Sequence, residues 1–188
     1  MTTPALETRR LLLRPLAIED APQIQEQFPH WDVVRYLAKV VPWPYPADGA
    51  LVFLRDTALP AMARGDAWTW TIRLKTNPAQ VIGSISLQKS ENKNRGFWLG
   101  LPWHRQGLMT EASDAVTDYW FDVLGFPVLR IPKAIANVGS RRISEKAGMR
   151  VVATFDRDFV SGRLPAELWE ITAEEWREKK SRRLAPPG

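Results

Sequence analysis

The feature that most constrains the fold is a change of hydrophobic period near the middle of the chain. Residues Trp68–Leu74 (WTWTIRL) alternate strictly between apolar and polar side chains, a period of two that is typical of a half-buried strand. From Leu108 onward the apolar residues recur at spacings of three and four, which predicts an amphipathic helix that ends at Gly125. Strands and a long helix in one chain predict a sheet with helices packed on it.

The other segments extend this pattern along the whole chain. Further strands are predicted over Leu6–Pro15, Val81–Leu87, Arg95–Leu101, Val128–Ile135, Met149–Val160 and Leu168–Ile171. Further helices are predicted over Ile18–Gln27, over Gly49–Arg64 with Asp48 as its cap, over Val138–Ala147, and after a capping box at Thr172–Glu175. This order predicts an α/β (α+β) fold, a mixed sheet with helices on both faces. No repeat or linker divides the chain, so we expect one domain over residues 1–176 and a flexible basic tail over 177–188.

The positive charge of the chain is concentrated at its end. The formal net charge is +5 at pH 7, and residues 177–188 (REKKSRRLAPPG) contain five basic side chains and one acidic side chain. The rest of the chain is therefore close to neutral, which argues against a nucleic-acid-binding domain. The tail itself is either a solubilising end or a docking site for an acidic partner such as RNA.

Several classes of protein are excluded by what the sequence lacks. No apolar run is long enough for a membrane helix, and the N-terminal segment is not typical of a secretory signal. There is no cysteine, and the two histidines, His30 and His104, lie far apart, so we expect no metal site. No glycine motif of a nucleotide-binding enzyme occurs. We therefore expect a soluble, cytoplasmic protein.

The segment Trp103–Ala112 (WHRQGLMTEA) joins a predicted strand to the long helix. The free amides of such a turn and the helix dipole attract phosphate. Gly107 permits close approach to the backbone, Arg105 adds a positive charge and Thr110 a hydroxyl, whereas Glu111 complements the helix dipole. Taken alone, a strand–glycine–helix turn is more often structural than ligand-binding.

A second segment, Asn137–Met149, follows the next predicted strand, and together the two segments resemble the GNAT superfamily of acyl-CoA-dependent N-acetyltransferases. Within that superfamily the chain is similar to the ribosomal-protein alanine/serine N-acetyltransferase branch. The resemblance covers nearly the whole chain. It is carried, in order, by LETRRLLLRPL (6–16), VIGSISL (81–87), FWLG (97–100), GLMTEA (107–112), NVGSRRISEKAGM (137–149) and LWEITAEEW (168–176).

The resemblance implies a mostly antiparallel sheet of about seven strands, whose two middle strands part to admit the pantetheine arm of acetyl-CoA. Pro132, which has no backbone N–H for a strand ladder, is compatible with that gap. The resemblance also implies that a bound primary amine attacks the thioester directly in a ternary complex, without a metal. The residues it assigns to the acetyl-CoA site are Leu99, His104, Arg105, Gln106, Gly107, Leu108, Met109, Thr110, Asn137 and Arg142.

The chain departs from the family pattern at two of these positions. The family usually has Gln or Arg where this chain has His104, and Gly or Ala where it has Met109. Because the amides of the loop, rather than its side chains, are expected to hold the pyrophosphate, His104 is compatible with binding. The longer side chain of Met109 either crowds the phosphates or turns into the core.

The resemblance assigns the acid that protonates the leaving thiolate to Ser140, and it places Asn137 on the pantetheine arm. Read without the resemblance, Asn137 is a helix cap. For the base that deprotonates the amine, Asp158 is preferred to Asp156, with surface charge as the alternative for both. An oxyanion donor is expected among the amides of Phe97–Leu101, where the family's strand carries a bulge.

The acceptor amine is left open by the sequence. Trp31, Trp43 and Tyr45 are expected to wall the substrate side of the site, although an aromatic cluster belongs to a core as often as to a site. The acceptor is a protein N-terminus or a small molecule such as a polyamine, an amino acid or an antibiotic. A hypothesis from another class is a degenerate domain that binds acyl-CoA or RNA without catalysis. A homodimer is compatible with the sequence, and no feature decides it.

Overall fold

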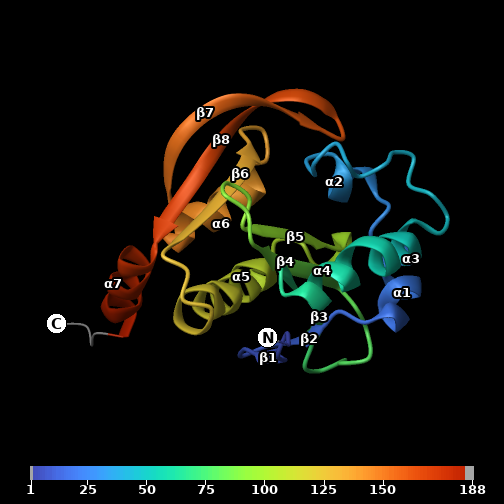
Figure 1. Cartoon of the computed structure of the whole chain (residues 1–188), viewed down its shortest axis with the longest axis horizontal. Helices are drawn as coiled ribbons and strands as arrows, with labels where there is room; N and C mark the ends of the chain where they lie inside the picture. Colours follow the sequence, from blue (N-terminus) through green and yellow to red (C-terminus); the bar gives the residue numbers. More distant parts are fainter. Residues whose placement is uncertain (1, 185–188) are drawn as a thin grey trace.

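The computed structural model describes residues 2–184, which form two antiparallel sheets (Figure 1). The first sheet has its strands in sequence order: β1 (Leu6–Glu7), β2 (Leu11–Pro15), β3 (Ala67–Leu74), β4 (Gly83–Gln88) and β5 (Arg95–Leu99). The second sheet has β8 (Gly162–Thr172) between β6 (Val128–Ala134) and β7 (Arg150–Phe159). The predicted α/β architecture is confirmed, with eight strands among the described residues instead of about seven.

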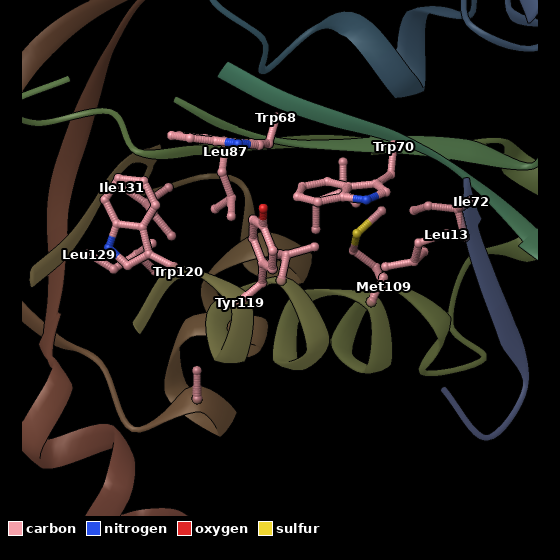
Figure 2. Close-up of a cluster of buried hydrophobic side chains, with 14 of the residues drawn as sticks. Leu13, Trp68, Trp70, Ile72, Leu87, Met109, Tyr119, Trp120, Leu129 and Ile131 are labelled. Atoms are coloured by element: carbon pink, nitrogen blue, oxygen red, sulfur yellow. The ribbon is translucent and has the colours of Figure 1, made fainter. Parts of the chain in front are cut away.

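The alternation in β3 decides which face of the first sheet is apolar. Trp68, Trp70 and Ile72 are buried on the side of α5 (Leu108–Asp118), as Figure 2 shows. The residues between them point to the opposite face, because successive side chains of a strand alternate. The helix continues beyond α5 as a π-helical segment, η4 (Tyr119–Val123), and Gly125 then adopts a φ of +72°. The predicted strand and the predicted end of the helix are both confirmed, but the strand is buried on both faces instead of one, because Thr69, Thr71 and Arg73 are buried too.

The opposite face of the first sheet is covered by helices from the N-terminal third of the chain. They are η1 (Ile18–Asp20), α1 (Ala21–Gln27), α2 (Trp31–Val34), α3 (Gly49–Phe53), η2 (Leu54–Ala58) and α4 (Leu59–Arg64). The last three run on from one another, as predicted over Gly49–Arg64, with a π-helical middle part. Asp48 occupies the N-cap position of α3, but its side chain makes no capping hydrogen bond, so the predicted cap is wrong.

Two helices are connected to the strands of the second sheet, and the first residues of both were predicted from the sequence. Asn137 caps α6 (Val138–Ala147) by accepting a hydrogen bond from Ser140 N at 3.2 Å. The capping box at the start of α7 (Ala173–Leu184) is also confirmed: Thr172 N donates to Glu175 Oε2 (2.8 Å), and Glu175 N donates to Thr172 Oγ1 (3.2 Å).

The C-terminal boundary differs from the prediction. Helix α7 extends to Leu184, so residues 177–184 of the expected flexible tail are helical. The remaining part of that expected tail, residues 185–188, lies outside the described residues. A capped helix with acidic residues in its first turn and basic residues towards its end is favoured by the helix dipole, which accounts for this continuation.

Strands β7 and β8 form a long hairpin that arches over the gap between the sheets (Figure 1). Its tip is joined to the segment after α2, because Val160 N donates to Leu37 O (3.0 Å) and Ser161 N donates to Arg35 O (3.1 Å). β8 begins at Gly162, earlier than predicted, because Pro165 interrupts the strand pattern in the sequence without ending the strand.

Within residues 2–184, no helix is both long enough and apolar enough to cross a bilayer. The same part of the chain contains no group of three or more histidine or acidic side chains placed to hold a metal ion.

Candidate active site

The two sheets approach each other at β5 and β6, but these two strands are not paired. They are joined at one end, where Asn94 N donates to Arg130 O (2.8 Å) and Arg130 N donates to Asn94 Oδ1 (2.7 Å). Beyond this junction β6 has a strand partner on one side alone, namely β8, and Pro132 lies in that stretch. The predicted splay of the central strands is confirmed.

A cavity of about 670 Å³ occupies this gap, a volume in the range of pockets that hold small molecules. Its walls come from both sides of the gap. The N-terminal helices and the following segment contribute Tyr45 and Phe53, β5 contributes Trp98, and the start of α6 contributes Asn137 and Ser140. A ligand that fills the cavity therefore contacts residues that are distant in the sequence.

Lys133 of β6 occupies the part of the cavity next to Ser140. Its side chain is 4% exposed, and its Nζ atom donates to Ser140 Oγ at 2.6 Å and to Ser140 O at 2.9 Å. The ammonium also lies 5.3 Å from the ring centroid of Phe97. Burial, followed by the charge of Arg95, lowers the pKa of Lys133 well below its ordinary value. The sequence analysis missed this residue, because nothing in a strand pattern marks one lysine as buried.

Asn137 and Ser140 both line the cavity, as the resemblance implies, and the capping function of Asn137 is also present. Its Oδ1 atom accepts the hydrogen bond from Ser140 N, which leaves the side-chain NH₂ for a ligand. The cap holds the first turn of α6 with Ser140 facing Lys133. One asparagine can therefore satisfy the structural and the binding interpretation together.

The predicted phosphate loop leads from β5 into α5. It starts with a 3₁₀ turn, η3 (Leu101–Trp103), after which His104 Nε2 donates to Leu99 O at 2.8 Å. Arg105 and Gly107 both have positive φ angles, +61° and +74°. The loop therefore reverses sharply before the helix begins.

The first turn of α5 presents free backbone amides. The first hydrogen bond of the helix runs from Glu111 N to Gly107 O (3.1 Å). The amides of Leu108, Met109 and Thr110 thus lie outside the helix's own ladder, as in the first turn of any helix. Such amides bind anions, because they point along the positive end of the helix dipole.

The side chain of Met109 is turned into the core. It is 7% exposed and packs beside Leu13, Trp70 and Ile72 (Figure 2). The sequence left two alternatives open, and the structure shows the second: the side chain turns into the core and does not point towards the phosphate loop. Gln106, in contrast, is exposed and donates from Nε2 to Pro102 O at 2.9 Å.

Glu111 ties the first hairpin of the chain to the phosphate loop. Its carboxylate accepts hydrogen bonds from Thr8 Oγ1 (2.5 Å), from Arg10 N (2.7 Å) and from Arg10 Nε (2.7 Å). Arg10 Nη1 also donates to Gln106 O at 3.0 Å. Burial alone would raise the pKa of Glu111, but the hydrogen bonds from Thr8 and Arg10 and the Arg10 charge outweigh it and lower that pKa. Glu111 thus positions the loop, a role beyond the predicted dipole effect.

Asp158 does not reach the cavity. It lies in β7 between Arg157 and Phe159, which both line the cavity, so its own side chain points to the other face. Its side chain is 46% exposed, and its Oδ2 atom lies 3.9 Å from Lys39 Nζ. Asp156 shares that outer face, 3.8 Å from Arg163. The two aspartates share a face as predicted, but it is the face away from the gap.

Strand β5 pairs with β4 in continuous register from Arg95 to Leu99. The bulge expected within Phe97–Leu101 is therefore absent from the paired part of this strand. The register irregularity recorded in the second sheet lies in β7, between Val151 and Ala153. Any oxyanion donor of β5 must come from the strand edge that faces β6, which lacks a strand partner.

The three predicted aromatic wall residues lie in two places. Tyr45 lines the cavity and packs edge-on against Phe28, with ring centroids 5.0 Å apart. Trp31 and Trp43 pack on each other, with ring centroids 5.6 Å apart, and are 43% and 41% exposed. Neither of them lines the cavity. The structure thus brings one of the three to the site.

The two arginines of α6 have different surroundings. Arg141 forms an ion pair with the buried Glu167, with Nε donating to Oε2 at 2.9 Å and Nη2 donating to Oε1 at 3.2 Å. Arg142 is exposed on the helix surface. Of the two, Arg142 is the one whose guanidinium is available to a phosphate.

Comparisons with known proteins identify the family. The model of the acetyltransferase (GNAT) domain matches residues 10–150, most of the chain. No curated protein sequence matches the chain. Among solved structures, a GNAT-family acetyltransferase from Bacillus anthracis is 20% identical, with a TM-score of 0.75 over 92% of this chain and 100% of that one.

Two further structures carry specific names. The ribosomal-protein-S5-alanine acetyltransferase from Vibrio fischeri is 14% identical, with a TM-score of 0.76 over 92% of this chain and 98% of that one. The ribosomal L7/L12 N-terminal acetyltransferase RimL, in complex with coenzyme A, is 15% identical, with a TM-score of 0.75 over 92% and 99%. At these low sequence identities, the TM-scores establish a shared fold and no shared substrate. The family model and the fold agree, and the chain belongs to the GNAT family of acetyl-CoA-dependent N-acetyltransferases.

Proposed function

We propose that the protein transfers the acetyl group of acetyl-CoA to a primary amine that enters the cavity between β5 and β6. The observation that carries the proposal is the position of Ser140 and Lys133, hydrogen-bonded to each other where the cavity passes between the two sheets. An acyl thioester in the gap would lie beside a hydroxyl and a buried amine. The amine attacks directly, in a ternary complex, so that no acyl-enzyme is formed.

The donor is proposed to bind along the gap with its pyrophosphate at the start of α5. The amides of Leu108, Met109 and Thr110 are the groups that would receive the phosphate oxygens. The remaining members of the proposed donor site are Leu99, His104, Arg105, Gln106, Gly107, Asn137 and Arg142. Asn137 would donate its side-chain NH₂ to the pantetheine arm while its oxygen caps α6.

The proton transfers are proposed to run through Lys133 and Ser140. Attack by a neutral amine leaves a proton on its nitrogen and a negative charge on the departing sulfur. Neutral Lys133 takes up the proton from nitrogen, while Ser140 protonates the thiolate and is reprotonated by Lys133. The net reaction converts amine and thioester into amide and thiol without loss of a proton. Lys133 thus replaces Asp158, which lies on the outer face of β7.

The acceptor is proposed to approach from the side of Tyr45 and the N-terminal helices, where the cavity wall is mainly apolar. A protein N-terminus and a small amine are both compatible with this wall. The contrasting hypothesis is a module that binds RNA without catalysis, and the following experiment distinguishes it from an acetyltransferase.

The test is calorimetric titration of the full-length protein with acetyl-CoA, with CoA and ATP as controls. We expect acetyl-CoA and CoA to bind and ATP not to bind, because the pantetheine arm, absent from ATP, fills the gap. Release of free thiol in the presence of amines and short peptides then measures transfer. Lack of binding by both CoA species would contradict the proposal and would favour the module without catalysis.

Replacement of Gly107 by valine is expected to weaken acetyl-CoA binding roughly tenfold or more, because the loss of several amide contacts to phosphate exceeds 1.4 kcal/mol. A β-branched residue is strained at the φ of +74° found here, so the loop would move and its amides would no longer converge. Calorimetry of the variant with acetyl-CoA measures the change.

The matched control is Gly125→Val, because Gly125 has almost the same φ, +72°, and open space around it, but lies beyond η4. It should lose similar stability and keep acetyl-CoA affinity. Equal affinity losses in both variants would show that strain alone, rather than the phosphate loop, is responsible.

A further inference from the structure

We infer that the acceptor amine carries an anionic group, a carboxylate or a phosphate, that binds between Lys93 and Arg157 on the wall of the cavity. The inference rests on the proposed function, because it concerns the substrate of the same cavity. It narrows the acceptor to amines that combine an apolar part with a negative charge.

The two cations come from different parts of the fold and meet at one cavity. Lys93 lies in the turn between β4 and β5, and its carbonyl accepts a hydrogen bond from Gln88 Nε2 at 2.8 Å. Arg157 lies in β7, with its guanidinium 5.9 Å from the ring centroid of Phe159. Backbone hydrogen bonds from Val160 and Ser161 to the segment after α2 hold the hairpin that carries Arg157 beside the cavity.

Neither cation has a carboxylate partner among residues 2–184. Other arginines of the second sheet differ in this respect: Arg130 pairs with Glu170 (2.7 Å), and Arg150 pairs with the same glutamate (2.5 Å). Arg157 is the arginine of that sheet that lines the cavity, and it has no carboxylate partner in the described part of the chain. Arg163 of the same sheet also has a carboxylate partner, Asp156 (3.8 Å), so the unpaired Arg157 is left to a ligand.

The electrostatics of the cavity favour an anion. Its other cationic lining residues are Arg95 and Lys133, and the acidic residue among its described lining residues is Asp48, which is exposed at the start of α3. Burial, followed by the charge of Arg157, lowers the pKa of Lys93, and burial lowers the pKa of Arg157. Two partly desolvated like charges are stabilised by an anion placed between them.

The rest of the wall defines the other parts of the ligand. Apolar side chains from the N-terminal helices and the following segment face the cavity, among them Leu37, Val41 and Phe53. The ligand therefore presents an apolar group to this wall, its anion to Lys93 and Arg157, and its amine towards Ser140. Amino acids, short peptides with an acidic side chain and phosphorylated amines share this chemistry.

The experiment compares acetylated products, because their binding does not require turnover. Three pairs are titrated into the full chain: N-acetylphenylalanine and its amide, acetyl-Ala-Asp-amide and acetyl-Ala-Asn-amide, and N-acetylphosphoserine amide and N-acetylserine amide. We expect the anionic member of at least one pair to bind about tenfold more tightly than its neutral partner, as for a charge-assisted contact. The pair that shows the difference identifies the source of the anion.

Lys93→Met and Arg157→Met should each abolish that difference, while Arg163→Met should preserve it. Arg163 is a matched control because it lies in the same hairpin, is exposed, and pairs with Asp156 outside the cavity. Equal binding of the two members in every pair, or a difference that survives both cavity variants, would overturn the inference. A failure of the proposed function is separate: it would appear as no thiol release with any amine, while product binding is measured independently.

Discussion

Replacing Lys133 by methionine is expected to lower kcat for acetyl transfer by about 10²- to 10³-fold, the contribution typical of general acid–base catalysis. Acetyl-CoA affinity should change little, because the phosphate loop lies on another element. The value of kcat should fall because the variant removes both the acceptor for the amine proton and the hydrogen-bond partner of Ser140 Oγ, 2.6 Å away. Steady-state release of free thiol, together with calorimetry, measures the two quantities.

The pH profile separates a chemical role of Lys133 from a structural one. Because the neutral form of Lys133 is the active one, wild-type kcat should rise with pH through the lowered pKa of this lysine. The methionine variant should lose that rise on the same amine. Lys133→Arg should not restore activity, since an arginine stays charged. An unchanged kcat in the methionine variant would remove Lys133 from the mechanism.

Ser140→Ala should lower kcat similarly, and the double variant should be no worse than the poorer single variant. Residues that act as one relay have strongly non-additive effects. Additive losses would show that Lys133 and Ser140 act independently.

The same lysine should oppose folding near neutral pH. The unfolded chain keeps a lysine protonated up to about pH 10.4, whereas burial lowers the pKa of Lys133 in the folded state. Between these two values the unfolded state binds more protons, so this residue makes stability rise with pH. Lys133→Met should therefore be at least as stable as the wild type at pH 7. This outcome also shows that lost activity is not lost folding.

Replacing Trp120 by alanine is expected to reduce the free energy of unfolding by about 3–5 kcal/mol, as for other buried large-to-alanine changes. Trp120 is 1% exposed and stacks on Phe126, with ring centroids 4.0 Å apart and an interplanar angle of 16°. Its Nε1 atom donates to Val128 O at 2.9 Å, at the start of β6. The substitution creates a cavity and also leaves that carbonyl without its donor. Urea unfolding, followed by circular dichroism, measures the loss.

Trp31→Ala is the comparison for this prediction. Trp31 is 43% exposed, and its ring packs on that of Trp43, which is itself exposed, so its removal should cost less than about 1 kcal/mol. Similar losses of unfolding free energy in the two variants would contradict the prediction that burial sets the size of the effect.

Local elements could be predicted because their signals lie within a few residues. The alternation of Trp68–Leu74 marks a strand with one apolar face, and that apolar face packs against α5; that the polar face is buried as well could not be read from the alternation. Asn137 and the Thr172–Glu175 box act on amides three residues away, so their functions could be read from spacing. The turn before α5, which is the proposed phosphate loop, could be predicted in the same way, since a glycine before a helix is a local pattern.

Other features of the site depend on contacts between distant segments. Which side of β7 faces the gap could not be decided from its alternation, and the prediction placed Asp158 inward, whereas Arg157 lines the cavity. The clamp between Arg10 and Glu111 joins positions that are 101 residues apart. No local pattern carries such information.

The sequence by itself determined the types and order of most elements, though not the short helix α2, together with the caps of α6 and α7 and the loop that begins α5. These signals are local because backbone hydrogen bonding and side-chain period act over short distances. The tertiary structure alone decided the meeting of Lys133 with Ser140 and the inward direction of Arg157. It also decided the turning of Met109 into the core. Burial and the charges around a side chain are set by elements that the chain brings together from far apart, so these properties exist only once the two sheets have packed.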